Sequence, residues 1–206
     1  MNGDCLLKIC DFGLARGATQ VEEEEGLSEY VATRWYRAPE VILSWNYYTK
    51  AIDMWSVGCI FAELIGRKPL FRGTDYIQQI NCILDIIGTP SEEEIANTIQ
   101  NEKARKYVRS LGYHAKVSFA KLYPQASLEA LDLLEGLLTF DPMKRITVEQ
   151  ALEHPYFVGL HDPNDEPSCP SAFNFDFEKD ALSKEQYRGM HNVFLLISLV
   201  FRIHLS

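Results

Sequence analysis

The chain has 206 residues, the length of one domain or two small ones. It carries 20 Lys and Arg against 29 Asp and Glu, which gives a formal net charge of −9, and 47% of its residues are hydrophobic. This composition is that of a globular protein with a core and excludes a disordered tail. The negative charge argues against nucleic acid or an anionic membrane as partner, because both would repel the chain, whereas basic peptides remain compatible.

The sequence is typical of a protein from a reducing compartment. Its first residues lack a basic segment followed by an apolar run, so we expect no signal peptide. The five Cys are scattered without a Cys-x-x-Cys pair, which favours free thiols. The longest apolar run, residues 193–201, is far shorter than the roughly 20 residues of a membrane span. We therefore expect no membrane association.

The first half of the chain predicts a short strand, a loop and two helices. Residues 5–9 are typical of a short β-strand, and an acidic, Gly-containing loop follows from Asp11 to about Tyr36. Residues 49–65 are apolar on nearly all sides, which predicts a buried helix that ends at Gly66. A further helical face is predicted by the apolar stripe of Ile77, Ile80, Leu84 and Ile87.

Further helices are predicted downstream, mainly from their N-terminal signals. The segments Ser91–Glu94 and Thr147–Gln150 are capping boxes, each of which starts a helix. Leu128, Leu131, Leu134 and Leu138 form another helical stripe. Residues 97–126 are mixed and polar, and they show no clear element. The predicted fold is mainly helical, with a short strand pair near its start.

Four motifs occur in an order that is more specific than any one of them alone. Asp11-Phe12-Gly13 follows the predicted strand, and Ala38-Pro39-Glu40 lies downstream of it. The apolar helix then contains Asp53-Met-Trp-Ser-Val-Gly58, and Arg145 comes later, after Phe140-Asp141-Pro142. In this order the chain resembles the C-terminal part of a eukaryotic protein kinase, an incomplete C-terminal lobe of the kinase fold.

The segment between the first two motifs narrows the resemblance. Residues 26–37, Gly-Leu-Ser-Glu-Tyr-Val-Ala-Thr-Arg-Trp-Tyr-Arg, resemble the activation lip and substrate-pocket loop of a mitogen-activated protein (MAP) kinase. The Ser28-Glu29-Tyr30 triplet is similar to that of the extracellular-signal-regulated branch, with Ser in place of the usual Thr. Residues 167–170 and 174–177 are similar to the cell-wall-integrity kinases of that branch.

The resemblance implies roles for the residues of the first motif and the lip. Asp11 would supply a carboxylate to the Mg²⁺ that bridges the ATP phosphates, whereas Phe12 and Gly13 would be structural. Ser28 and Tyr30 would be phosphorylated, and each phosphate would add about −1.5 to −2 charges to the loop. Three arginines would pair with these phosphates: Arg16 with that of Ser28, and Arg34 and Arg37 with that of Tyr30.

Further positions receive roles in the same way. Arg37 would help to form the pocket for a Pro that follows the phosphorylated Ser or Thr, and Thr33 would support the catalytic loop. Glu40 and Arg145 would form a buried ion pair. Asp53 is expected to be buried and unsatisfied, or exposed to water, because the loop that it holds in kinases is not in the sequence. The same absence would leave an apolar face of its helix open to solvent.

Two docking surfaces are also implied. Asp162, Asp165 and Glu166 lie in a segment that resembles the acidic docking site for basic motifs on MAP kinase kinases, substrates and phosphatases. Taken alone, these acids would favour a solvated acidic turn, whereas the family resemblance favours docking. A second pocket, for aromatic motifs, would use Tyr76, Ile77, Ile80 and Tyr107, for which helix-face packing is an equally good interpretation. The five His lack metal-ligand spacing, and we expect them to have no site role.

The expected function is that of a Ser/Thr protein kinase of MAP kinase type, represented by a fragment. Kinases place the Gly-rich loop, the ATP-binding Lys and the catalytic His-Arg-Asp upstream of Asp11, and none is found in this sequence. We therefore expect no phosphoryl transfer by this chain alone and weak binding of ATP and Mg²⁺, which would belong to the full-length parent. The alternatives are a non-catalytic docking module or decoy and a truncated gene product without function.

Three regions are expected along the chain. Residues 1–157 would form the partial kinase domain, 158–187 a C-terminal extension with the acidic docking segment, and 188–206 an atypical tail, which is either a retained intron or a genuine alternative end. The family resemblance implies a cytoplasmic and nuclear location.

Overall fold

The computed structural model describes residues 9–11, 34–43 and 49–166. The chain divides into two compact units, one of residues 1–17 with 168–206 and the other of residues 18–167. The described residues of the first unit are 9–11, and all others belong to the second. Within these ranges the fold is helical and no residue lies in a β-strand, which confirms the helical class. The expected strand at 5–9 lies outside the described residues, except for Ile9, which is not in a strand.

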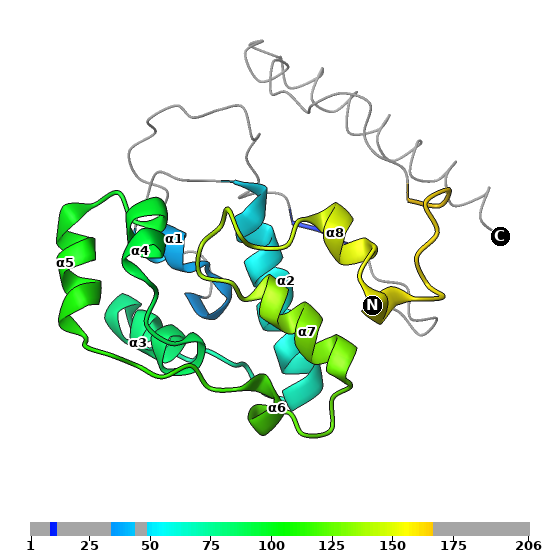
Figure 1. Cartoon of the computed structure of the whole chain (residues 1–206), viewed down its shortest axis with the longest axis horizontal. Coiled ribbons are helices and arrows are strands. Elements are labelled where there is room, and N and C mark those ends of the chain that lie inside the picture. The colour runs from blue at the N-terminus through cyan, green and yellow to red at the C-terminus, as the bar shows by residue number, and fades with distance from the viewer. Residues whose placement is uncertain (1–8, 12–33, 44–48, 167–206) are drawn as a thin grey trace, which may run out of the picture. The chain divides into compact units, whose positions relative to one another are not determined.

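Figure 1 shows the helices of the second unit. In the described ranges they are η2 (Arg34–Tyr36), α1 (Pro39–Leu43), α2 (Lys50–Gly66), α3 (Tyr76–Ile87), α4 (Glu92–Thr98), α5 (Glu102–Ser110), α6 (Phe119–Leu122), α7 (Leu128–Leu137), α8 (Val148–Leu152) and η3 (Pro155–Phe157). Within the same ranges, no helix is long and apolar enough to cross a bilayer.

Helix α2 carries the largest side chain of the core. Trp55 is fully buried and stacks on Phe71, with 5.6 Å between the ring centroids. Cys59 and Ala62, one and two turns further on, are buried in the same core cluster. Gly66 is the last helical residue, and the helix is closed by Arg67 in the left-handed conformation, with its N–H donating to the Glu63 carbonyl.

The expectation that this helix is buried on nearly all sides is wrong. Asp53, Val57, Ile60 and Leu64 are exposed, and their spacing places them along one face of α2. The opposite face is covered because α2 packs against α7 and η2. A different expectation, that Asp53 and an apolar face of this helix would be exposed because the sequence contains no catalytic loop, agrees with the structure.

Helix α3 buries a face slightly rotated from the predicted stripe. Ile80 and Leu84 are buried as expected, but Ile77 is 61% exposed and Ile83 is buried instead. The predicted apolar stripe starts at Ile77 and continues at intervals of three and four residues, whereas the face that meets the core is centred between positions 80 and 83. The contacts of α3 with α1 and η2 decide that rotation.

Both predicted capping boxes are confirmed. The Ser91 hydroxyl accepts from the Glu94 N–H and the Glu94 carboxylate from the Ser91 N–H at the start of α4. Thr147 and Gln150 make the same reciprocal pair at the start of α8. These contacts satisfy N–H groups that have no partner within the helix.

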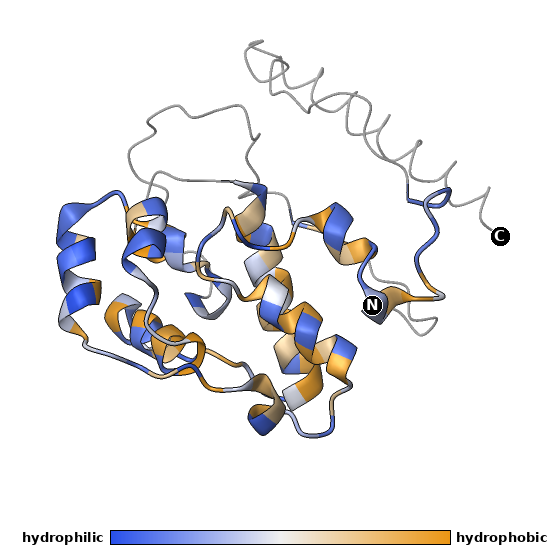
Figure 2. Cartoon of the chain, in the orientation of Figure 1, coloured by the Kyte–Doolittle hydropathy of each residue, from blue (hydrophilic) through white to orange (hydrophobic). Residues whose placement is uncertain are grey.

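The polar stretch without a predicted element contains two helices. Asn101 caps the N-terminus of helix α5, and its side chain accepts from the N–H groups of Lys103 and Ala104. Figure 2 shows α5 as a largely hydrophilic ribbon. Val108 is the buried residue of α5 and anchors that helix to the core. Phe119, the first residue of α6, is buried in the same way. Sequence periodicity misses both helices because each contributes one fully buried side chain.

Helices α2 and α7 lie side by side and approach closely at Gly58 (Figure 1). A Cβ built on Gly58 would lie 2.8 Å from Leu138 Cδ2 and 2.9 Å from Leu137 Cβ. Both leucines are buried. A glycine at this position therefore sets the distance between the two helices.

We expect Gly58→Ala to destabilise the chain by about 1–3 kcal/mol, because overpacking at this contact outweighs the higher helix propensity of Ala. Gly136→Ala is the matched control, since a Cβ there meets Ile146 at an ordinary 3.4 Å. It should be neutral or stabilising by up to about 1 kcal/mol. Urea unfolding of both variants measures the difference, and equal stabilities would contradict the packing argument.

Candidate functional site

The segment of residues 34–43 is held by a buried ion pair at its end. Arg145 Nη1 lies 2.7 Å from Glu40 Oε1 and Nη2 lies 3.0 Å from Oε2, and both side chains are completely buried. The planar guanidinium therefore meets the carboxylate through two parallel hydrogen bonds. The pair that the sequence predicts is present, and it joins α1 to the connection before α8.

The remaining donors of Arg145 are also satisfied. Nε donates to the Thr139 carbonyl at 3.0 Å, Nη1 to that of Ala51 at 2.6 Å and Nη2 to that of Phe140 at 3.2 Å. With the two bonds to Glu40, each N–H of the guanidinium has an acceptor. The guanidinium carbon also lies 5.1 Å from the centre of a ring of Trp55. One side chain thus connects α1, α2 and the end of α7.

We expect Arg145→Met to lower the free energy of unfolding by about 3–5 kcal/mol, because it leaves the Glu40 carboxylate buried without its partner. Lys144→Met is the matched control, since Lys144 is half exposed and lies 3.9–4.0 Å from its carboxylate partners. It should change stability by less than about 1 kcal/mol. Denaturant titration tests both, and an Arg145→Met variant as stable as the control would refute the role of the pair.

Residues 34–37 are bonded to the connection between α2 and α3. Arg34 Nη1 donates to the Thr74 carbonyl at 2.8 Å, and Trp35 Nε1 donates to the Gly73 carbonyl at 3.0 Å. Arg37 Nη1 donates to Tyr76 Oη at 2.7 Å. The segment is therefore positioned by elements far from it in the sequence.

Gln79 completes this junction from inside the core. Its fully buried side chain accepts from the Gly73 N–H at 2.9 Å and points its amide nitrogen at the carbonyls of Phe71 and Trp35, at 3.4 and 3.5 Å. A Cβ on Gly73 would lie 2.5 Å from the Gln79 backbone, so Gly73 must be glycine for this approach. The sequence interpretation missed Gln79, although a Gln on the apolar face of a helix is the signal that could have found it.

Tyr76 brings together two arginines that the sequence assigns to a phosphate. The guanidinium carbons of Arg34 and Arg37 lie 5.5 and 5.7 Å from the centre of its ring, within the range of a cation–π interaction. The Arg34 Nε is buried and has no hydrogen-bond partner among the residues that the structure describes. Two positively charged side chains therefore meet at one aromatic ring.

Tyr36 is fixed in its protonated form by Glu63. Its hydroxyl donates to Glu63 Oε2 at 2.7 Å, and this hydrogen bond, with partial burial and the carboxylate charge, raises the pKa of Tyr36 to about 12. The Tyr36 carbonyl accepts from the Ser56 hydroxyl at 2.9 Å. Both contacts hold Tyr36, and with it the end of η2, against α2.

We expect Tyr36→Phe to weaken the pH dependence of stability above about pH 10. Because the folded pKa is raised above 10.0, the contribution of this proton is complete below about pH 10 and is lost as the pH rises toward about 12. The stability gap between parent and variant should therefore narrow from about pH 8 to about pH 11 in urea titrations. A gap that stays constant would show that Tyr36 has an ordinary pKa.

Asp11 is described within the first unit. It is exposed and has a φ of 63°, in the left-handed region that Asp adopts more readily than most residues. Among the described residues, no three His, Cys, Asp or Glu side chains are grouped to hold a metal ion. The described part of the chain therefore supplies one candidate ligand for Mg²⁺ and does not form a complete site.

Several residues singled out from the sequence lie outside the described ranges. They are Phe12, Gly13, Arg16, Ser28, Tyr30 and Thr33.

The acidic segment that the sequence predicts to be a docking site is described up to Glu166 and has a defined local structure. Asp162 Oδ1 accepts from the backbone and side-chain nitrogens of Asn164, at 2.9 and 3.1 Å. Glu166 pairs with His161 at 2.8 Å, whereas the side chains of Asp162 and Asp165 are exposed. Two of the three predicted carboxylates therefore face solvent, and the third is turned toward its own segment.

The residues of the second predicted docking pocket have different environments. Ile80 is buried in the core, Ile77 is exposed, and Tyr76 contacts the arginines already described. Tyr107 Oη lies 3.5 Å from Asn81 Oδ1. Ile80 is therefore a core residue, whereas Ile77 is accessible at the surface.

Each of the three histidines among the described residues lies beside a carboxylate: His114 beside Asp85 at 2.8 Å, His154 beside Asp132 at 3.1 Å and His161 beside Glu166 at 2.8 Å. The two residues of each of the first two pairs are more than 20 positions apart, so sequence spacing could not reveal them.

The sequence pattern of the protein kinase domain matches residues 1–157. The chain belongs to the protein kinase family. The buried Glu40–Arg145 pair and the anchored segment before it are thus features of a kinase domain.

Proteins similar to this kinase chain are MAP kinases. It is 61% identical over 185 residues to Extracellular signal-regulated kinase 1 of Dictyostelium discoideum, which is 90% of this chain and 35% of that protein. It is 59% identical over 180 residues to Mitogen-activated protein kinase MPS1 of Pyricularia oryzae and 57% to Mitogen-activated protein kinase SLT2/MPK1 of Saccharomyces cerevisiae. Each match covers 86% of this chain, and 43% and 37% of the relative. The chain therefore spans less than half the length of these relatives.

Proposed function

We propose that this chain forms the substrate-binding, helical part of a Ser/Thr protein kinase of MAP kinase type. The proposed reaction is ATP-dependent phosphorylation of Ser or Thr followed by Pro. The observation that carries the proposal is the anchoring of residues 34–37 by Gly73, Thr74 and Tyr76 on one side and by the buried Glu40–Arg145 pair on the other. A pocket that selects one residue of a peptide needs such a fixed framework.

Arg37 is the proposed specificity residue of the pocket. Its hydrogen bond to Tyr76 fixes the direction of the guanidinium, and the Tyr36 carbonyl beside it is held by Ser56. In this arrangement, Arg37 and the backbone around it would shape the space that receives the Pro of the substrate. Thr33 would support the catalytic loop of the complete kinase.

Phosphorylation of Ser28 and Tyr30 is the proposed switch. The guanidinium carbons of Arg34 and Arg37 lie beside the same Tyr76 ring, so the two arginines would form a cationic site to which phosphorylated Tyr30 would bind. Arg16 would bind the phosphate of phosphorylated Ser28. A phosphate bound there would fix the lip to the anchored segment.

The proposed activity depends on groups that the 206 residues do not include. The sequence contains no His-Arg-Asp triplet and no Gly-x-Gly-x-x-Gly loop. ATP would be held chiefly by those groups, and Asp11 would contribute one carboxylate to Mg²⁺. By itself the chain would act at most as a docking module, which is the second candidate function.

The exposure of Asp162 and Asp165 supports the role of a docking module. It also supports the binding of the same partners by the complete kinase. Two carboxylates on a short, internally hydrogen-bonded turn would attract basic motifs of MAP kinase kinases, substrates and phosphatases in the cytoplasm and nucleus.

A chimera tests the proposed reaction. The residues of the Dictyostelium relative that precede the matched region, joined to this chain, should phosphorylate a Thr-Pro peptide after activation, whereas the 206 residues alone should not. Arg37→Ala in the chimera should reduce the preference for Thr-Pro over Thr-Ala by about tenfold, because the pocket loses its fixed side. Radiometric assays with the two peptides measure this ratio.

Arg72→Ala is the control for the chimera, because Arg72 is exposed and makes none of the anchoring contacts described above. It should leave the peptide ratio unchanged. A folded chimera that is inactive, or one without a preference for Pro, would contradict the proposal.

A further inference from the structure

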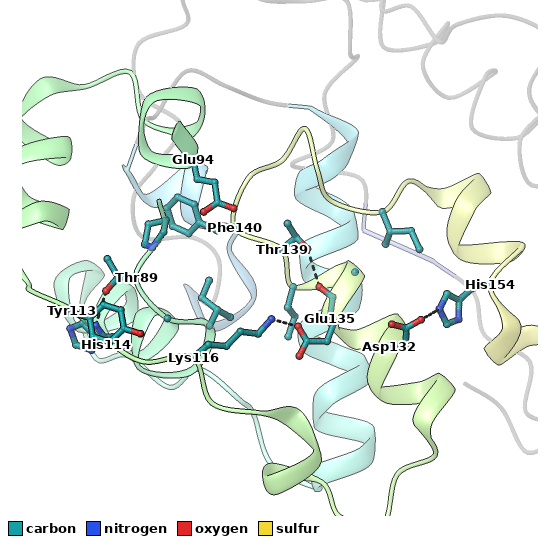
Figure 3. Close-up of a pocket in the computed structure, with 16 residues that line it drawn as sticks. Thr89, Glu94, Tyr113, His114, Lys116, Asp132, Glu135, Thr139, Phe140 and His154 are labelled. Atoms are coloured by element: carbon teal, nitrogen blue, oxygen red, sulfur yellow. Dashed lines mark hydrogen bonds and ion pairs between the residues drawn. The ribbon is translucent and has the colours of Figure 1, made fainter. Parts of the chain in front are cut away.

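A polar groove lies on the second unit, on elements other than those of the anchored segment (Figure 3). It has a volume of about 640 Å³ and runs along the end of α3, the start of α4, residues 113–116 and the end of α7, as far as His154. Its side chains include carboxylates, a lysine and an exposed tyrosine. No function described above uses it.

Backbone contacts make the floor of the groove rigid. Gly88 has a φ of 86°, and a Cβ there would lie 3.0 Å from the Lys116 nitrogen, so the two chain segments cross at van der Waals distance. The Thr89 N–H donates to the His114 carbonyl at 3.0 Å, and the Val117 N–H donates to that of Ile86 at 2.8 Å. The groove is therefore preformed, which lowers the entropic cost of binding.

The charges of the groove have a net negative balance. Glu94, Asp132 and Glu135 line it together with Lys116, which points at Glu135, and with His114 and His154. The Glu94 carboxylate also caps α4 and lies 3.9 Å from Lys144 Nζ. Asp132 pairs with His154 at its edge, and its side chain remains 79% exposed. Asp132 and Glu135 lie three positions apart on α7, so both carboxylates extend from the same face of the helix into the groove lining.

The groove also offers an aromatic surface, which an acidic cluster alone would not. Tyr113 lines one end with 86% of its surface exposed, and Pro90, Phe140 and Ile146 supply apolar lining. A guanidinium can stack on an aromatic ring and meet a carboxylate through two hydrogen bonds, which a lysine ammonium does less well. The combination of lining groups therefore fits arginine.

We propose that this groove binds an arginine-containing segment of a partner protein. The segment places one guanidinium against Asp132 and Glu135, in competition with Lys116, and a second on the ring of Tyr113. This site is distinct from the docking segment of Asp162 and Asp165, and it does not rest on the proposed kinase activity.

Fluorescence anisotropy with the full chain tests the proposal. The probe is fluorescein-labelled Arg-Gly-Arg-Gly-Arg, and the matched probes carry Lys or Glu in place of Arg. We expect the Arg probe to bind most tightly, the Glu probe not to bind, and added NaCl to weaken the binding. Equal binding of the Arg and Glu probes would overturn the proposal.

Variants of the groove give effects of opposite sign. Asp132→Asn with Glu135→Gln should weaken binding of the Arg probe by about tenfold, because both carboxylate partners are lost. Lys116→Met should strengthen it by about threefold, since it removes the competing cation. Tyr113→Leu, at a solvent-exposed position, should remove the preference for Arg over Lys. Local damage to the fold would not strengthen binding, so Lys116→Met separates recognition from structural effects.

The double variant Asp162→Asn with Asp165→Asn is the control for the other acidic surface. In NMR spectra of this variant, the Arg probe should still cause the same amide chemical-shift changes at Gly136 and Thr139 as in the parent chain. If it abolishes binding while the Asp132 and Glu135 variant binds like the parent, the probe occupies the docking segment and the proposal is wrong.

Discussion

The buried pair of Glu40 and Arg145 is the interaction on which the second unit of this chain depends. A desolvated guanidinium is costly unless all its donors are satisfied, and here five acceptors from three parts of the chain meet it: α1, α2 and the end of α7. Removing Glu40 would leave the guanidinium charge buried without its counter-charge. The pair therefore fixes α1, and with it the segment that precedes α1, in one position relative to α2 and the end of α7.

A second buried polar group extends this order toward the surface. Gln79 holds Gly73 and points toward the Trp35 carbonyl, so the connection before α3 and the Arg34–Arg37 segment are positioned together. The arginines of the segment then meet Tyr76 at the start of α3. The cationic site is thus a consequence of core packing. The two arginines meet there because their segment is hydrogen-bonded to the connection before α3 and to Gln79.

The exposed charges are organised differently, as pairs between neighbouring elements. His114 with Asp85, His154 with Asp132 and Lys116 with Glu135 all lie around one groove. Exposed pairs of this kind contribute little to stability. They do set which charges remain available at the surface, and the surplus of carboxylates there gives the groove its preference for cations. The same fold therefore presents a cationic site near Tyr76 and an anionic one along α7.

The sequence by itself determined the local features of this protein. The two capping boxes and the helical class follow from residue types at short spacing, and the relation to kinases follows from motifs in a fixed order, none of which requires knowledge of packing. The partnership of Glu40 with Arg145, 105 positions apart, was expected only because of that family resemblance. Tertiary structure alone decided which face of α2 is exposed, that Ile83 rather than Ile77 is buried, and that Gln79 is a core residue. It also decided that the histidines have partners. Those outcomes depend on contacts between residues far apart in the chain, and a one-dimensional pattern records the composition of a helix face but not the neighbour that covers it.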